Sequence, residues 1–302
     1  MEYNNETLPV ESRATMLRRL FVFICLTLGG MCLAALLISF IVKNPPTAVQ
    51  LRISTILQDV IVFIFPAVAI AVVSSTLPAC FLSLDRVPRV WPMFWAIVAL
   101  IVSAPIQNQI IAWNEAIRLP ESMVSVERWM RAAEESARAS AEIIMGGSTV
   151  GDLIMGLLVA GILAGLSEEL FFRGALQRIF TLSDRHVHAA IWSAAFIFSA
   201  MHFQFYGFLP RLLLGAFFGY VVAWSGSLWI AIIVHALNNM MVVVSSWNAR
   251  RLGVDNQLEA IGIDSPLMLA FSLLLTIAAL SMLYRCCRKN LAQKHRELTK
   301  NS

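Results

Sequence analysis

Residues 149–180 read TVGDLIMGLLVAGILAGLSEELFFRGALQRIF. A stretch of this length can cross a bilayer, because a membrane-spanning helix needs about 20 mostly apolar residues. Its second half nevertheless contains Glu168, Glu169 and Arg173, which are side chains that a lipid environment strongly disfavours. The stretch therefore predicts a membrane helix that carries polar groups at depth.

The whole chain has the composition of a membrane protein. Of its 302 residues, 58% are hydrophobic and 14% are charged, and the mean hydropathy is +0.72. Soluble domains are about half apolar and about a quarter charged. The chain lacks the polar side chains that would cover a water-soluble surface. Composition therefore argues against a soluble enzyme and against a nucleic-acid partner.

The apolar stretches predict the fold class, an all-α polytopic membrane helix bundle of about eight transmembrane helices. We expect the spans at about 20–42, 56–82, 90–111, 149–180, 188–205, 209–224, 228–247 and 266–284. Between the third and fourth spans, apolar residues recur at helical spacing among charged ones. This pattern predicts an amphipathic outer helix, which lies on the membrane, caps the bundle or is a solvated connector.

Basic residues predict the orientation, because cytoplasmic segments carry an excess of Lys and Arg. Most of them fall on one side if the eight spans alternate and both termini are cytoplasmic. These are Arg13, Arg18, Arg19, Arg86, Arg89, Arg173, Arg178, Arg185, Arg285, Arg288, Lys289, Lys294, Arg296 and Lys300. Short terminal tails and the lack of a eukaryotic sorting signal favour a multi-pass protein of a bacterial plasma membrane.

Four regions follow from this topology. We expect a cytoplasmic N-terminal tail at 1–19, and spans 1–3 with the outer connector at 20–148. A core of spans 4–7 occupies 149–247. An outer loop, span 8 and a basic cytoplasmic tail fill 248–302.

Helix geometry separates the roles of the two adjacent carboxylates. Glu169 and Arg173 are four residues apart with the Glu first, which favours an ion pair on one helix face. Glu168 projects about 100° away. A carboxyl that lacks this partner in a low dielectric is suited to act as a general base. The alternative is that the span ends before Glu168 and that water solvates both carboxylates.

Two further spans carry polar residues at comparable depth. His202 ends the fifth span, while His235 and Asn239 share one face of the seventh. At about 1.5 Å per residue, Glu168, His202 and His235 lie about 18, 21 and 10 Å from the inner ends of their spans. We therefore expect these side chains to meet, although a membrane His can also be a hydrogen-bonded packing residue.

Such a cluster suits attack of water on a carbonyl, most plausibly that of a peptide bond. A carboxylate and an imidazole can activate one water molecule, and a second imidazole with an amide can stabilise an oxyanion. We expect no cofactor. The alternative is a zinc ion on Glu168, His202 and His235, because two histidines and a carboxylate form a known catalytic zinc site.

Three motifs resemble those of the CAAX prenyl endopeptidase and bacteriocin-processing superfamily, also called CPBP or ABI. They are Glu168-Glu169-x-x-x-Arg173, Phe198-x-x-x-His202 and His235-x-x-x-Asn239. The resemblance covers roughly residues 153–244. It implies an eight-helix intramembrane endopeptidase, and thus a peptidase that acts on a membrane-associated protein or peptide. Lipidated substrates are known in the eukaryotic members.

The resemblance also implies the roles of the motif residues. Glu168 and His202 would activate water, and His235 and Asn239 would form the oxyanion hole. Glu169 and Arg173 would be supporting residues. Of the mechanisms considered for the family, we favour the metal-free one with a catalytic glutamate.

Two other functions fit the same residues. The first is a non-catalytic bacteriocin-immunity or membrane binding module on the same fold. The second is a proton-coupled transporter, since membrane carboxylates and histidines also form proton relays. Its further ionisable groups would be Asp59 and Asp152, which we place near span ends.

Overall fold

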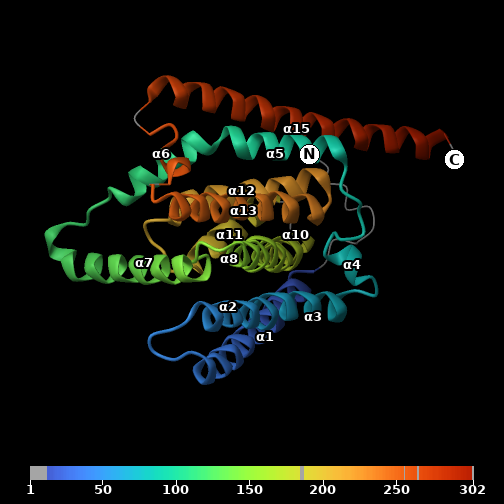
Figure 1. Ribbon diagram of the computed structural model, residues 1–302. Coiled ribbons are helices and arrows are strands. Elements are labelled where there is room, and N and C mark those ends of the chain that lie inside the picture. Colours follow the sequence, from blue (N-terminus) through green and yellow to red (C-terminus); the bar gives the residue numbers. More distant parts are fainter. Residues whose placement is uncertain (1–11, 184–186, 255, 264, 301–302) are drawn as a thin grey trace.

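The computed structural model describes residues 12–183, 187–254, 256–263 and 265–300, and these residues contain no β-strand. Figure 1 shows α15 and α5 on one side of the bundle, α1 to α3 on the opposite side, and α8 to α13 between them. Residues 1–11 of the predicted N-terminal tail and Arg185 lie outside the described residues. The chain is an all-α helix bundle, as its sequence predicts.

The first two predicted spans form the layer of α1 to α3. Helix α1 covers Arg13–Ile41. The second span is one composite helix of α2 (Ala48–Gln58), the π-helical η1 (Asp59–Ile64) and α3 (Phe65–Ser74). The side chain of Thr47 accepts a hydrogen bond from the backbone of Gln50 and starts α2 with a capping box. The short helix α4 follows at Pro78–Phe81.

The third predicted span is broken. Helix α5 (Val90–Val102) and helix α6 (Ala104–Glu115) meet at an angle of 46°. Pro105 lies in the first turn of α6, where its ring is tolerated although it would disrupt a continuous helix. The short 3-10 helix η2 (Glu121–Met123) and helix α7 (Val124–Ile144) follow.

The fourth predicted span is a composite helix with two π-helical segments. Its parts are α8 (Val150–Gly156), η3 (Leu157–Leu163), α9 (Ala164–Glu169), η4 (Leu170–Leu176) and α10 (Gln177–Ser183). The pair Glu168–Glu169 lies between the two π-helical segments. Such segments are frequent at functional sites, because they change the direction in which side chains project.

The remaining helices complete the bundle. They are α11 (Val187–Ala200), α12 (Phe208–Ser225), α13 (Leu228–Leu252), α14 (Gln257–Ala260) and α15 (Pro266–Lys300). Gly226 and Gly253 end α12 and α13 in the left-handed conformation, with φ of 71° and 67°. Glycine favours such helix ends because it has no Cβ.

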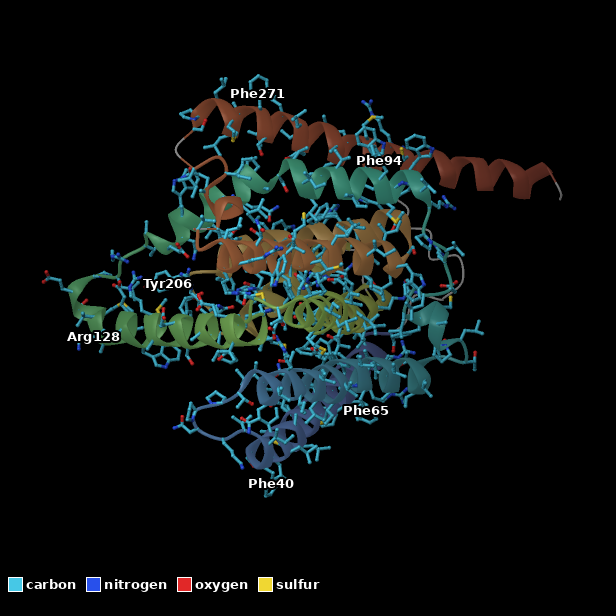
Figure 2. The ribbon with its side chains drawn as sticks, in the orientation of Figure 1. Phe40, Phe65, Phe94, Arg128, Tyr206 and Phe271 are labelled. Atoms are coloured by element: carbon cyan, nitrogen blue, oxygen red, sulfur yellow. The ribbon has the colours of Figure 1, made fainter. Side chains whose placement is uncertain are left out.

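The bundle presents apolar side chains outward, as a lipid-embedded protein does. Among the described residues, six helices are long and apolar enough to cross a membrane, and the bent pair of α5 and α6 gives a seventh. Helix α11 is apolar but has only 14 residues. Figure 2 shows Phe40, Phe65, Phe94 and Phe271 at the periphery of the bundle, where 47–79% of each is exposed. The chain is a multi-pass membrane protein.

Hydrogen bonds near the helix ends show which segments meet at each end of the bundle. At one end, Arg19 donates to Ser74 O (3.0 Å) and Ser227 Oγ to Arg86 O (2.7 Å). At the other end, Trp247 donates to Thr149 O, Asn114 to Phe205 O and Asn108 to Leu258 O. The described segments therefore alternate between two ends in the order that the sequence predicts. Tyr284 of α15 contacts Trp224 of α12 (5.4 Å between ring centroids), so α15 leads back to the end at which α1 begins.

The predicted amphipathic outer helix is α7. In Figure 1 it extends to the left beyond the ends of α2 and α8. It packs against α2, and Glu134 accepts hydrogen bonds from Gln204 Nε2 and the backbone N–H of Tyr206, both at 3.1 Å. Helix α7 thus covers the loop between α11 and α12. These contacts agree with a helix that caps the bundle.

Candidate active site

Glu169 and Arg173 form an ion pair inside the bundle. Arg173 NH1 donates to Glu169 Oε1 at 2.8 Å, and both side chains are fully buried. Arg173 NH2 also donates to Gly215 O at 2.7 Å, and the guanidinium lies 4.6 Å from the ring centroid of Phe198. The alternative of two solvated carboxylates is therefore wrong for Glu169. The local spacing of four residues predicts this pair.

The same carboxylate also holds His235. His235 Nδ1 lies 2.8 Å from Glu169 Oε1, and the imidazole stacks on Phe218 with ring centroids 4.6 Å apart. A carboxylate beside Nδ1 accepts its proton and fixes the orientation of the ring. Sequence reasoning did not identify this contact, since the two residues are far apart in the chain.

Glu168 lies between the two imidazoles. Its Oε1 is 3.9 Å from His202 Nε2, and its Oε2 is 3.6 Å from His235 Nε2. The Glu168 side chain is partly buried and lies within the candidate span Val150–Thr181. The structure thus brings one carboxyl group and two imidazoles from three segments to one place inside the bundle.

His202 lies in a turn and not on a helix. Helix α11, which corresponds to the fifth predicted span, ends at Ala200, so the predicted end of this span near Phe205 is wrong. Residues 201–203 form a turn that carries Phe203 at a positive φ of 52°. His202 Nδ1 lies 2.8 Å from Phe198 O. Because a carbonyl oxygen only accepts, Nδ1 is the donor and Nε2 faces Glu168 as an acceptor.

Glycines bring the helix of Glu168 close to the helix of His235. A Cβ added to Gly165 would lie 2.9 Å from the backbone nitrogen of Ala236, and one added to Gly161 would lie 2.8 Å from Met240 Cγ. The Gly161-x-x-x-Gly165 spacing predicts such an approach. The close packing of α9 on α13 places Glu168 and Glu169 within reach of His235.

Asn239 lies one turn after His235 on α13. Its Oδ1 accepts a hydrogen bond from Asn238 Nδ2 at 3.3 Å. Within the described residues, no hydrogen bond joins Asn239 to Glu168, His202 or His235. Its own Nδ2 makes none there either, so that this donor is available to a ligand. Asn239 is thus the predicted site residue for which the described residues show no hydrogen bond to the others.

Asp59 adds a buried carboxyl group next to the site. Ser167 Oγ donates to Asp59 Oδ1 at 3.0 Å, and 4% of Asp59 is exposed. Asp59 lies well inside the candidate span Ala48–Ser74, so its predicted place near a span end is wrong. Asp152 forms an ion pair with Arg52, with 3.2 Å between Asp152 Oδ1 and Arg52 NH2.

The described residues also bear on a metal site. No group of three or more His, Cys, Asp and Glu side chains among them has the geometry to hold a metal ion. His202 Nε2 and His235 Nε2 approach different oxygens of Glu168. A zinc ion on these three residues would need them to rearrange.

Comparison with protein families connects this geometry to a known chemistry. Residues 150–241 match the family described as type II CAAX prenyl endopeptidase Rce1-like. This segment is similar to the Rce1-like family. The matched segment contains Glu168, Glu169, Arg173, His202, His235 and Asn239. Rce1-like proteins are CAAX-type intramembrane proteases, so the chain is related to peptidases that act at a bilayer on membrane-associated peptides.

Two other comparisons gave no relative. Neither the curated proteins nor the solved structures include a match to this chain. The relation to the Rce1-like family therefore depends on residues 150–241 alone.

A polar network beside His202 was not predicted from the sequence. Glu134 of α7 binds Gln204 and Tyr206, and Arg211 NH2 donates to Gln204 Oε1 at 2.7 Å. One signal was available, because Arg211 is a charged residue just inside the apolar stretch of α12. The network ties the turn of His202 to α7 on one side and to α12 on the other.

Proposed function

We propose that the protein is an intramembrane endopeptidase in which Glu168 and His202 activate a water molecule for attack on a peptide bond. The observation that carries this proposal is the 3.9 Å separation of Glu168 Oε1 and His202 Nε2. A water molecule at about 2.8 Å from both atoms fits such a separation. Both atoms are acceptors when Glu168 is ionised, and together they can orient the water and remove its proton.

His235 and Asn239 are proposed to stabilise the oxyanion of the tetrahedral intermediate. Glu169 accepts the Nδ1 proton of His235, and in this scheme Nε2 of the ring carries a proton as well. His235 Nε2 then donates toward the space beside Glu168. The free Nδ2 of Asn239 supplies a second donor one turn away. Preorganised donors of this kind are worth about 3–4 kcal/mol each to the transition state.

Proton transfer completes the reaction. The proton taken from water by Glu168 and His202 passes to the departing amine nitrogen as the carbon–nitrogen bond breaks, and both residues return to their starting state. Glu169 and Arg173 do not react in this scheme. They hold His235 in place through one buried carboxylate oxygen.

The setting of the reaction is part of the proposal. We propose that the protein lies in a bacterial plasma membrane with both termini in the cytoplasm. The substrate is a membrane-associated protein or peptide and is not a nucleic acid; a lipid chain on it would explain its presence at the membrane. The reaction needs no metal ion.

Comparative proteomics of membrane peptides tests the proposal. Cells with the wild-type protein should contain cleavage products that disappear with Glu168→Ala and with His202→Ala, while both variants are still folded and present in the membrane. Glu135→Ala on the exposed face of α7 is the control and should keep the products. Products that persist in both site variants would contradict the proposal and favour the non-catalytic binding or immunity module.

Metal dependence is tested separately. We expect cleavage by the purified protein to continue after incubation with a strong zinc chelator. A loss of cleavage that added Zn²⁺ restores would contradict the metal-free mechanism and support the zinc site on Glu168, His202 and His235.

A further inference from the structure

Arg211 is a partly buried cation beside the loop that follows His202. It lies in the first turn of α12, and its NH2 donates to Gln204 Oε1 at 2.7 Å. The guanidinium packs on the loop that follows His202, since a Cβ added to Gly207 would lie 2.9 Å from Arg211 NH2. Figure 2 shows Tyr206, in the same loop, at the end of the bundle beside α7.

The partners of the partly buried Arg211 differ from those of Arg52 and Arg173, which are buried. Arg173 and Arg52 each contact a carboxylate, at 2.8 and 3.2 Å. Within the described residues Arg211 has no ion pair, and its NH1 is buried without a hydrogen-bond partner. A guanidinium nitrogen that is buried without a hydrogen-bond acceptor is unfavourable. A ligand that supplies the missing acceptor would remove this cost.

The nearby carboxylates are already engaged. Both oxygens of Glu134 accept hydrogen bonds from the loop, one from Gln204 and one from Tyr206. Glu168 faces the two imidazoles. The charge of Arg211 interacts with those of Glu134, Glu168 and His202. The guanidinium itself contacts the loop that follows His202, so a group bound to NH1 would lie next to this loop.

We propose that Arg211 binds a carboxylate of the substrate and so sets which peptide bond is cut. The proposal rests on the proposed endopeptidase function. A peptide supplies such a group either as its C-terminal carboxylate or as an Asp or Glu side chain near the scissile bond. Arg211 recognises both through a charge-assisted hydrogen bond. In this role Arg211 is a specificity-determining residue that does not take part in proton transfer.

Two peptide libraries test the proposal with purified protein in lipid vesicles. Both contain short, N-terminally palmitoylated peptides of the same degenerate sequence, and they end in a free carboxylate or in an amide. We expect wild type to cleave the acid library about ten-fold faster or more, at a fixed distance from the C-terminus. Arg211→Gln should bring the ratio of the two rates to about one, whereas Arg211→Lys should keep part of the preference.

A matched control and the product sequences separate the outcomes. Arg128→Gln removes one positive charge from the exposed surface of α7 (Figure 2) and should keep the preference. If Arg211 binds an acidic side chain, products of both libraries will show Asp or Glu at one position, and Arg211→Gln will abolish this enrichment. Equal rates without enrichment in wild type, or a preference that Arg211→Gln leaves intact, would overturn the proposal.

Binding distinguishes failure of this proposal from failure of the proposed function. If wild type cleaves neither library in a Glu168-dependent way, the endopeptidase function fails. In that case the two libraries are added to the Glu168→Ala protein, and its thermal stability shows whether Arg211 binds a carboxylate. Stabilisation by the acid library alone, lost in the double variant with Arg211→Gln, supports the carboxylate site. Equal stabilisation by both libraries would overturn it.

Discussion

Glu169 serves two partners with one oxygen atom. Its Oε1 accepts from Arg173 at 2.8 Å and from His235 at 2.8 Å. The side chain is fully buried, so water cannot replace either partner. Loss of its charge would leave the guanidinium of Arg173 without a carboxylate in the interior of the bundle. Removing one member of a buried ion pair strongly destabilises a protein, because the other charge is left buried without a partner.

We predict that Glu169→Gln lowers the free energy of unfolding by about 3–5 kcal/mol. The measurement is an unfolding titration with SDS in detergent micelles. Glu142→Gln is the matched control, because Glu142 pairs with Arg138 at 3.5 Å on the exposed surface of α7 and such pairs are worth about 1 kcal/mol or less. Equal effects of the two substitutions would contradict the role given to Glu169.

Residue-level features could be predicted where they depend on local geometry. The pair of Glu169 and Arg173 follows from a spacing of four residues on one helix. The contact of Glu169 with His235 joins segments 66 residues apart, and it depends on how α13 packs against α9. Arg211 and Glu134 both contact Gln204 in the loop between α11 and α12, and these contacts likewise join segments that are far apart in the chain. No periodicity in one segment specifies such contacts.

Close contact between α9 and α13 is the element-level requirement of the candidate site. At Gly165 the helix approaches the backbone of α13, because the Cβ position lies 2.9 Å from the backbone nitrogen of Ala236. A backbone atom cannot turn away as a flexible side chain can. Any side chain at position 165 must therefore separate the helices that carry Glu168 and His235.

We predict that Gly165→Val destabilises the protein by about 1–3 kcal/mol, as overpacking does in other tightly packed cores. It should also slow cleavage, because the distance of 3.6 Å between Glu168 and His235 would increase. Thermal unfolding in detergent and the cleavage rate are the two measurements.

Gly29→Val is the matched control for this prediction. Gly29 is exposed on α1, and a Cβ there meets no atom within 4 Å. The control should change neither quantity appreciably. If Gly165→Val is as stable and active as the control, the two helices do not need this close approach.

The positions of the helices could be predicted from the sequence, but their bends, ends and π-helical segments could not. The apolar stretches located the helices, because burial in lipid requires about 20 apolar residues. The 46° bend between α5 and α6, the end of α11 at Ala200 and the π-helical segments around Glu168 were not predicted. Each depends on the packing of neighbouring helices, which hydropathy does not describe.

At the scale of the whole molecule, the bundle has two distinct ends. Arg19, Ser74, Arg86 and Ser227 join the loops of one end. Helix α7 and the loop of His202 lie at the other end, together with Arg211. The proposed carboxylate site therefore lies at this end of the bundle, where α7 covers the loop between α11 and α12.

We predict that this end is outside the cytoplasm. A reporter enzyme that is active only outside the cytoplasm, inserted at Ser148 after α7, should be active, and the same reporter at the C-terminus should be inactive. The physical reason is the excess of Lys and Arg in the segments assigned to the cytoplasm. The reverse pattern of activity would place the candidate site on the cytoplasmic side and contradict the assigned orientation.

The most direct test of the role of Glu168 compares the cleavage rates of wild type and Glu168→Gln in liposomes. The substrate is a peptide identified by proteomics. Glutamine keeps the shape of the side chain but cannot take a proton from water. We predict that the rate falls by about a hundred-fold or more while the melting temperature and the rate of a Glu135→Gln control stay near those of wild type. A folded Glu168→Gln protein that cleaves at the wild-type rate would contradict the account.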